Sequence, residues 1–355
     1  MISLSGFDFD KNMNLKCIAK TVQSGSFILG PSVIEFEKQF AAYSGSPDCV
    51  ATSCCTDALR LCLQAMRVKA GDTVAVPSFT WLSTAEVVKQ LNANCLFIDI
   101  NDSLTIDTDD LEEKLSHNPE CKTIIFVDLF GNIADIKKIQ EIANKYDCNL
   151  LEDAAQATGA RYNGNSLYSG HPVCYSFYPT KNLSCWGDAG AVACSEEFAD
   201  ALRSLRNHGQ NRTKFNSDVI GWNSRMDSIQ ADILLEKLPY LDTWNQRRRD
   251  IASLYKSHLT PTAKYQRINT DCEPVYHQFT IITDHAEQIY QHCLENNIQT
   301  RIYYSTPIHQ LPVYKNGQEL LFTESIASKN ICIPVHQYLQ DDEVEFIIKT
   351  VNECL

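Results

Sequence analysis

A lysine that follows a strand-like run is the residue best placed to do chemistry. Lys181 comes after the apolar run at residues 175–178 and a Pro-Thr turn, so its amine can project from a strand end into a cleft. A partly buried lysine loses proton affinity and becomes a nucleophilic amine that can form a Schiff base with a carbonyl compound. The competing interpretation is a surface lysine, which is far commoner for this residue type.

Three other residues occupy similar positions and have similar competing interpretations. Asp153 ends another apolar run, where a buried carboxylate needs a charged or hydrogen-bonding partner, or serves as a local cap. Thr56 opens a helix, where it can bind a phosphate or act as an ordinary N-cap. Trp81 follows a third run and could stack on a planar ring or pack in a core.

The elements that must position these residues alternate along the chain. Helical spacing of apolar residues recurs at 33–40 and 59–66, and strand-like runs occupy 73–76, 95–98, 123–127 and 149–151. Continuous apolar strands between helices predict a mostly parallel sheet that is covered on both faces. Ligands of such sheets bind beyond the carboxyl ends of the strands, which is where the polar residues of interest follow.

The second half of the chain predicts a smaller unit. A helical stretch over residues 226–258, with Pro239 as its breaker, is expected to connect to it, and a strand-like run at 279–282 and a helix from Asp342 follow. We therefore predict an α/β large domain over residues 1–240 and a small α+β domain over 241–355.

Composition and charge exclude several classes of protein. The 355 residues carry a net charge of -13, which argues against binding to a nucleic-acid backbone. The 15 cysteines form no C-x-x-C pair and no metal-ligand pattern, and they are expected to be reduced. His277, His309 and His336 are isolated in sequence, so no metal site is expected. No apolar run approaches the roughly 20 residues needed to span a membrane, and the N-terminus lacks signal-peptide character, so a cytoplasmic protein is expected.

Several ordered motifs resemble the DegT/DnrJ/EryC1/StrS family of sugar aminotransferases, which have the aspartate-aminotransferase fold (fold type I). The likeness covers most of the chain. The stretches that carry it are 30–37, 54–59, 77–81, 152–157, 176–183, 187–191, 221–227 and 230–231.

The resemblance implies a role for each matching position. Lys181 would hold pyridoxal 5'-phosphate as a Schiff base and move the proton at the substrate carbon, with pyridoxamine phosphate as the aminated form. The residues expected to bind the cofactor are Asp153 at the ring nitrogen, Gln156 beside the ring, Trp81 stacked on it, and Cys55, Thr56 and Ser176 at the phosphate. Asn223 would reach the phosphate of a neighbouring subunit, which implies a homodimer with shared active sites.

Five positions depart from the pattern of the family. Cys54-Cys55 replaces a common Ser-Gly, and Ala189 replaces a common glycine. Tyr303 and Asp128 stand where many members have histidine. These two are candidates to face the substrate, so they bear on which sugar is bound. His309 is expected to lie either in the substrate pocket or in the core.

The implied reaction transfers an amino group from glutamate to a nucleotide-linked keto sugar, with a dTDP-3-keto-6-deoxyhexose favoured. Amination at C4 or of a UDP-linked sugar is the alternative. A sugar 3-dehydratase would have histidine at position 181, and a non-catalytic sensor of the same fold would be expected to lack Lys181 or Asp153. Both residues are present.

Overall fold

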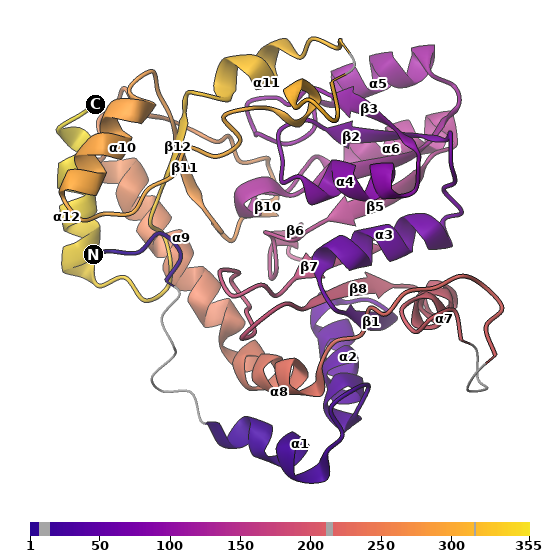
Figure 1. The fold of residues 1–355 in the computed structure, drawn as a ribbon. Helices are drawn as coiled ribbons and strands as arrows, with labels where there is room; N and C mark the ends of the chain where they lie inside the picture. Colours follow the sequence, from indigo (N-terminus) through magenta and orange to yellow (C-terminus); the bar gives the residue numbers. More distant parts are fainter. Residues whose placement is uncertain (7–14, 211–215, 316) are drawn as a thin grey trace.

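The computed structural model describes residues 1–6, 15–210, 216–315 and 317–355. Its centre is a seven-stranded sheet (Figure 1). In spatial order the strands are β1 (Asp48–Thr52), β8 (Gly190–Cys194), β7 (Val173–Ser176), β5 (Asn149–Asp153), β4 (Cys121–Val127), β2 (Thr73–Pro77) and β3 (Asn94–Ile98). Only β8 runs antiparallel to its neighbours. The predicted α/β fold with a mixed, mostly parallel sheet is confirmed.

Helices cover both faces of this sheet, because its strands are apolar on both sides. One face packs against α3 (Cys55–Ala65), α4 (Ser83–Gln90) and α7 (Glu196–Leu205). The other packs against α2 (Pro31–Ser44), α5 (Thr108–His117), α6 (Ile136–Tyr146) and α8 (Ser228–Lys237). Since side chains alternate between faces along a strand, neighbouring residues of β5 contribute to different cores.

Local sequence signals set the ends of these helices. Pro31 opens α2, and the left-handed Gly45 ends it. The Asp107 side chain accepts from the first amides of α5. The helix expected over 226–258 is interrupted by a 3-10 turn at Leu238–Tyr240, which contains Pro239.

A second cluster of secondary structure follows α9 (Leu241–His258), at the left of Figure 1. It contains the sheet β12 (Asn330–Ile333), β11 (Phe279–Ile282) and β9 (Lys264–Tyr265), with α10 (Ala286–Glu295) and α12 (Asp341–Asn352). The remaining elements are small. They include the short helix α11 (Leu321–Ile326) and a two-stranded sheet formed by β10 (Cys272–Glu273) and β6 (Arg161–Tyr162). The helix α1 (Ala19–Ser24) lies at the lower end of the view.

The predicted division at residue 240 falls where α9 begins, and it remains a prediction. One part of it needs revision, because the first residues do not lie with the large sheet. Ile2 bridges Ile298 and packs on the same apolar cluster as α10 and α12. Among the described residues, no helix is both long enough and apolar enough to cross a membrane.

Candidate active site

The amine of Lys181 lies at the carboxyl-terminal end of β7, as expected. The turn that carries it is closed by a hydrogen bond from the Lys181 amide to the Tyr178 carbonyl, 2.8 Å long. Burial lowers the pKa of the Lys181 amine to about 8, against the opposing effects of Cys55 and Asp153. About a tenth of the amine is therefore neutral at pH 7 and available for attack on a carbonyl carbon, far more than for an ordinary lysine.

Asp153 is a buried carboxylate at the end of β5, 3% exposed. Its oxygens accept from the Thr84 hydroxyl at 3.0 Å and from the Ala155 amide at 3.2 Å. Burial raises the pKa of Asp153, while these two hydrogen bonds and the charge of Lys181 lower it. No ion pair to Asp153 forms within the described ranges, so the carboxylate suits a cationic group of a ligand.

The N-terminus of α3 lies near these residues. The Cys54 sulfur and carbonyl accept from the amides of Asp57 and Ala58, so the earlier amides, of Cys55 and Thr56, point out of the first helical turn. Gly190 of β8 allows this approach, because a Cβ there would lie 2.5 Å from the Cys54 carbonyl carbon. The Ser176 hydroxyl ends β7 and accepts weakly from the Tyr178 amide. Such a helix end binds a phosphate well.

Two aromatic side chains remain exposed at these strand ends. Trp81 is 58% exposed and Tyr178 is 50% exposed. A large aromatic ring that is neither packed in a core nor hydrogen-bonded into the fold is available to stack on a ligand. Stacking of Trp81 on the cofactor ring remains a prediction.

Gln156 is held by two partners that the sequence did not indicate. Its Oε1 accepts from the Phe130 amide at 2.7 Å, and its Nε2 donates to the Tyr304 hydroxyl at 3.3 Å. The rings of Phe130 and Tyr304 stack at 6.1 Å. Thr84 was also not identified as a site residue from the sequence. Its position, three residues after Trp81 and beyond the same strand, could have indicated this role.

A cavity of about 300 Å³ reaches Lys181 from the side of α9. Its lining contains three basic residues, Lys181, Lys237 and Arg248, together with polar groups of Ser184 and Gln337. The Arg248 guanidinium is buried and donates to the Gln337 side chain and the Tyr276 carbonyl. No acidic residue of the described chain lines this cavity, so it suits a neutral or anionic molecule.

Two of the candidate substrate residues, His309 and Asp128, are buried. His309 is 2% exposed, with Nδ1 2.6 Å from the Ser78 hydroxyl and Nε2 3.1 Å from Glu324. Both ring nitrogens are thus engaged inside the protein. Asp128 is fully buried behind the sheet, so the expectation that it faces substrate is wrong. Tyr303 is partly buried and lies 3.5 Å from the Gln278 amide, and its contact with substrate remains a prediction.

Asn223 lies on the surface of the chain. Its side chain is exposed, and its backbone bridges Asn207. The adjoining Trp222 is fixed by a hydrogen bond to Gln64 and by the Arg60 guanidinium, 3.8 Å over its ring. The segment is therefore anchored with Asn223 pointing outward.

The described residues fit pyridoxal phosphate. They provide a half-buried amine of lowered pKa, a buried carboxylate without an ion pair, an exposed indole and an anion-binding helix end, all at strand ends of one sheet. A carbonyl, a protonated ring nitrogen, an aromatic ring and a phosphate are the four groups that these residues would bind.

Comparison with known proteins decides the family. Residues 9–352 match the DegT/DnrJ/EryC1/StrS aminotransferase family. The chain belongs to this family. The family resemblance inferred from the sequence motifs is confirmed.

Its curated relatives include transaminases named for sugars that are linked to different nucleotides. A dTDP-3-amino-3,4,6-trideoxy-alpha-D-glucose transaminase of Streptomyces venezuelae is 35% identical, over 95% of this chain and 90% of its own. A UDP-2-acetamido-2-deoxy-3-oxo-D-glucuronate aminotransferase of Pseudomonas aeruginosa is 34% identical, over 93% of this chain and 92% of its own.

Solved structures of relatives agree. DesV of S. venezuelae, in complex with a ketimine intermediate, superposes with a TM-score of 0.92 at 34% identity, over 95% of this chain and 93% of that one. NtdA of Bacillus subtilis, with bound pyridoxamine phosphate, superposes with a TM-score of 0.88 at 28% identity, over 96% and 80%. This member of the family is a pyridoxal-phosphate-dependent sugar aminotransferase, as the sequence predicted.

Proposed function

We propose that the enzyme transfers an amino group from glutamate to a nucleotide-linked keto sugar. The observation that carries the proposal is the presence, at the ends of the neighbouring strands β7 and β5, of the Lys181 amine, whose pKa is lowered to about 8, and of the buried Asp153 carboxylate, which forms no ion pair in the described chain. A lysine that must alternate between attacking a carbonyl carbon and carrying a proton needs a pKa near the working pH.

Each residue has a distinct task in this reaction. When bound, pyridoxal phosphate supplies an electron-withdrawing ring that stabilises negative charge on the adjacent carbon. Asp153 would keep a proton on the ring nitrogen, and Thr84 would hold that carboxylate in place. Lys181 would take a proton from the amino donor and return one to the sugar carbon through its Nζ.

Binding of the cofactor is assigned to the surrounding elements. The amides of Cys55 and Thr56, with the Ser176 hydroxyl, would hold the phosphate at the start of α3. Trp81 would cover one face of the ring, and Gln156 would lie beside it, fixed by Phe130 and Tyr304. Loss of Trp81 would expose the ring to water and leave its edge contacts in place.

The sugar is proposed to be a 3-keto-6-deoxyhexose carried on thymidine diphosphate. The S. venezuelae relative, whose name places an amino group at C3 of a dTDP-linked sugar, supports this choice. The P. aeruginosa relative supports the UDP-linked alternative, also with a 3-oxo sugar. The basic lining of the cavity beside Lys181 suits the diphosphate of either carrier, and it equally suits the two carboxylates of glutamate.

The active sites are proposed to be shared between two subunits. Asn223 is exposed on its anchored segment, and the preceding Ile220 is 86% exposed. A single exposed apolar residue is common and indicates little. Here Ile28, Trp81 and Tyr178 are exposed as well, so Ile220 is one of several exposed apolar side chains. A second copy of the chain that covered these residues would bring its own Asn223 to the phosphate site.

A panel of keto sugars tests the substrate. The enzyme is first loaded with pyridoxamine phosphate, and single-turnover return of the pyridoxal spectrum is followed with 3-keto and 4-keto sugars on dTDP and UDP. The proposal expects the dTDP-linked 3-keto sugar to react fastest. A faster 4-keto or UDP-linked sugar would replace this choice, and no reaction with any sugar would overturn the assignment to nucleotide sugars.

Two other functions of this fold have weaker support. A sugar 3-dehydratase is expected to carry histidine where this chain has Lys181. A non-catalytic sensor has no need of a lysine whose pKa is lowered next to a buried carboxylate, and both groups are present. Glutamate-dependent formation of 2-oxoglutarate would exclude both of these functions.

A further inference from the structure

A buried group of three titratable residues lies behind the sheet, on the face opposite Asp153. Glu152 precedes Asp153 in β5, so the two side chains point to opposite faces. Asp128 follows the end of the neighbouring strand β4, and both Asp128 and Glu152 are 0% exposed. His171 places its Nε2 2.6 Å from Glu152 Oε2, and its ring packs on Phe126.

The two carboxyl groups need a proton between them. Asp128 Oδ2 and Glu152 Oε1 are buried and have no hydrogen-bond partner among the described residues when both groups are carboxylates. The two side chains are close enough to share a hydrogen bond once one of them carries a proton. No lysine or arginine forms an ion pair with either one in the described chain, and the group cannot hold a metal ion. Two bare carboxylates in such a site would repel one another, and neither would recover its lost hydration.

The surroundings favour protonation of Asp128. Burial, followed by the charge of Glu152, raises the pKa of Asp128 well above its usual range. Burial also raises the pKa of Glu152, to about 8, while the hydrogen bond from Asp128 lowers it. Burial lowers the pKa of His171 to about 4, so its imidazole is neutral and donates from Nε2. The other titratable groups nearby are Asp153, Cys174, Tyr175 and Cys272.

Asp128 is connected to the cofactor side through a short loop. Its Oδ1 accepts from the Ala134 amide at 3.0 Å, and its own amide donates to the Asp153 carbonyl at 3.1 Å. These two hydrogen bonds fix the loop formed by residues 128–134, in which Phe130 has a left-handed backbone conformation. The Phe130 amide then donates to Gln156, which is the contact proposed to lie beside the cofactor ring.

We propose that Asp128 is a protonated positioning residue, whose hydroxyl donates to Glu152 and thereby holds the 128–134 loop and Gln156 in place for the cofactor. Glu152, steadied by His171, is the acceptor. The positioning role rests on the proposed contact of Gln156 with the cofactor, but the protonation of Asp128 does not.

The test compares two variants at Asp128. In Asp128→Asn the side-chain amide donates to Glu152 as the acid hydroxyl did, and its oxygen still accepts from Ala134. Its dissociation constant for pyridoxal phosphate is expected to stay within about threefold of the wild-type value. Asp128→Ala leaves a buried Glu152 oxygen without a donor and frees the loop, and the constant is expected to rise about tenfold or more. The visible absorption of the bound cofactor should change in the alanine variant only.

Infrared spectroscopy of the cofactor-free protein tests the proton directly. Above pH 8, where Glu152 is ionised, the wild type is expected to show the band of a protonated buried carboxyl group, and Asp128→Asn is expected to lose it. Persistence of the band in that variant, or no such band in the wild type, would overturn the protonation. Equal weakening of cofactor binding in the asparagine and alanine variants would also contradict it, and unchanged binding in both would overturn the positioning role. If Lys181 proved not to bind the cofactor, the infrared experiment would still test the protonation of Asp128, because it uses the cofactor-free protein.

Discussion

At the scale of single residues, the pKa of Lys181 makes the most direct prediction. Burial lowers this pKa to about 8, and only the neutral amine attacks the cofactor aldehyde. The rate at which the cofactor-free enzyme takes up pyridoxal phosphate should therefore rise about tenfold per pH unit below pH 8 and level off above it. Stopped-flow absorbance measures this rate. A rate that kept rising to pH 10, as for a free lysine analogue run in parallel, would contradict a lowered pKa.

Thr84 supports Asp153 and can be tested without changing a charge. Thr84→Val keeps the shape but removes the hydroxyl that donates to the carboxylate at 3.0 Å. The pKa of Asp153 should rise, and the dissociation constant of pyridoxal phosphate should increase about tenfold, since a hydrogen bond to a charged group contributes about 1.5–3 kcal/mol. Thr84→Ser is the matched control and should bind nearly as the wild type does. If the valine variant bound pyridoxal phosphate as tightly as the wild type does, Thr84 would not contribute to cofactor binding.

The sequence predicted the residues whose chemistry is visible from type and strand-end position, such as Lys181, Asp153 and Trp81. It could not predict the partners of Gln156, because Phe130 and Tyr304 come from segments far apart in the chain and meet only through tertiary packing. The prediction that Asp128 faces the substrate failed for a related reason. It follows a strand like the others, but its side chain points to the opposite face of the sheet.

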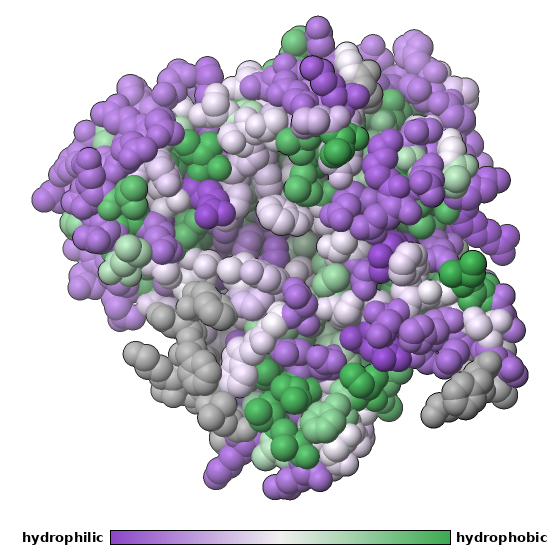
Figure 2. Space-filling view, in the orientation of Figure 1, coloured by the Kyte–Doolittle hydropathy of each residue, from purple (hydrophilic) through white to green (hydrophobic). Residues whose placement is uncertain are grey.

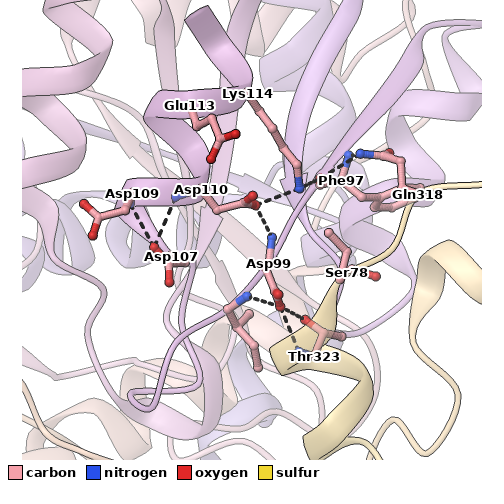
Figure 3. Close-up of polar contacts among 12 residues, drawn as sticks. Ser78, Phe97, Asp99, Asp107, Asp109, Asp110, Glu113, Lys114, Gln318 and Thr323 are labelled. Carbon is pink, nitrogen blue, oxygen red and sulfur yellow. Dashed lines mark hydrogen bonds and ion pairs between the residues drawn. The ribbon is translucent and has the colours of Figure 1, made fainter. Parts of the chain in front are cut away.

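At the scale of elements, α11 is tied to the end of the edge strand β3. Figure 3 shows Asp99, just beyond β3, accepting from Thr323 at the start of α11, and Gln318 pairing with the backbone of Phe97. The Asp99 carboxylate also accepts from the Phe322 amide at 3.0 Å. The segment from Tyr304 to α11 is thereby held against the sheet at both ends, since Tyr304 contacts Gln156.

This attachment predicts a stability change. Asp99→Ala removes three hydrogen bonds at the start of α11, and loss of a helix cap costs about 0.5–2 kcal/mol. The midpoint of thermal unfolding should fall by roughly a few degrees. Calorimetry measures the shift, with Asp99→Asn as a control that keeps one acceptor oxygen and should lose about half as much. An unchanged midpoint in the alanine variant would show that α11 is held by other contacts.

Four strands of the large sheet, β2, β3, β4 and β5, could be predicted from the sequence, since each contains an apolar run between helical segments. The antiparallel direction of β8 could not, because its residues, Gly190–Cys194, are as apolar as those of the parallel strands. The attachment of Ile2 beside Ile298 was also beyond prediction, because two residues at opposite ends of the chain carry no shared local signal.

At the scale of the whole molecule, the proposal of shared active sites requires a surface that a second copy of the chain could cover. Figure 2 shows apolar side chains gathered at the lower end of the visible face, around α1 and the start of α2. Val22, Phe27, Ile28 and Ile34 of these segments are 44–64% exposed. An apolar surface of this kind is typical of an interface between subunits.

A homodimer is therefore predicted in solution. Light scattering should give twice the mass of one chain. Ile220→Asp, which places a charge beside the exposed Asn223 segment, should shift the enzyme toward monomer and weaken retention of pyridoxal phosphate. Asn223→Ala should weaken cofactor retention without changing the mass. A wild-type monomer that binds the cofactor fully would contradict shared active sites.

The central claim is that Lys181 binds pyridoxal phosphate covalently. The most direct test is an absorption spectrum of the purified protein with added cofactor, before and after sodium borohydride, followed by peptide mapping of the reduced adduct. The account predicts a visible band that borohydride abolishes and a label on Lys181. No band, or a label on another lysine, would contradict the assignment of the site.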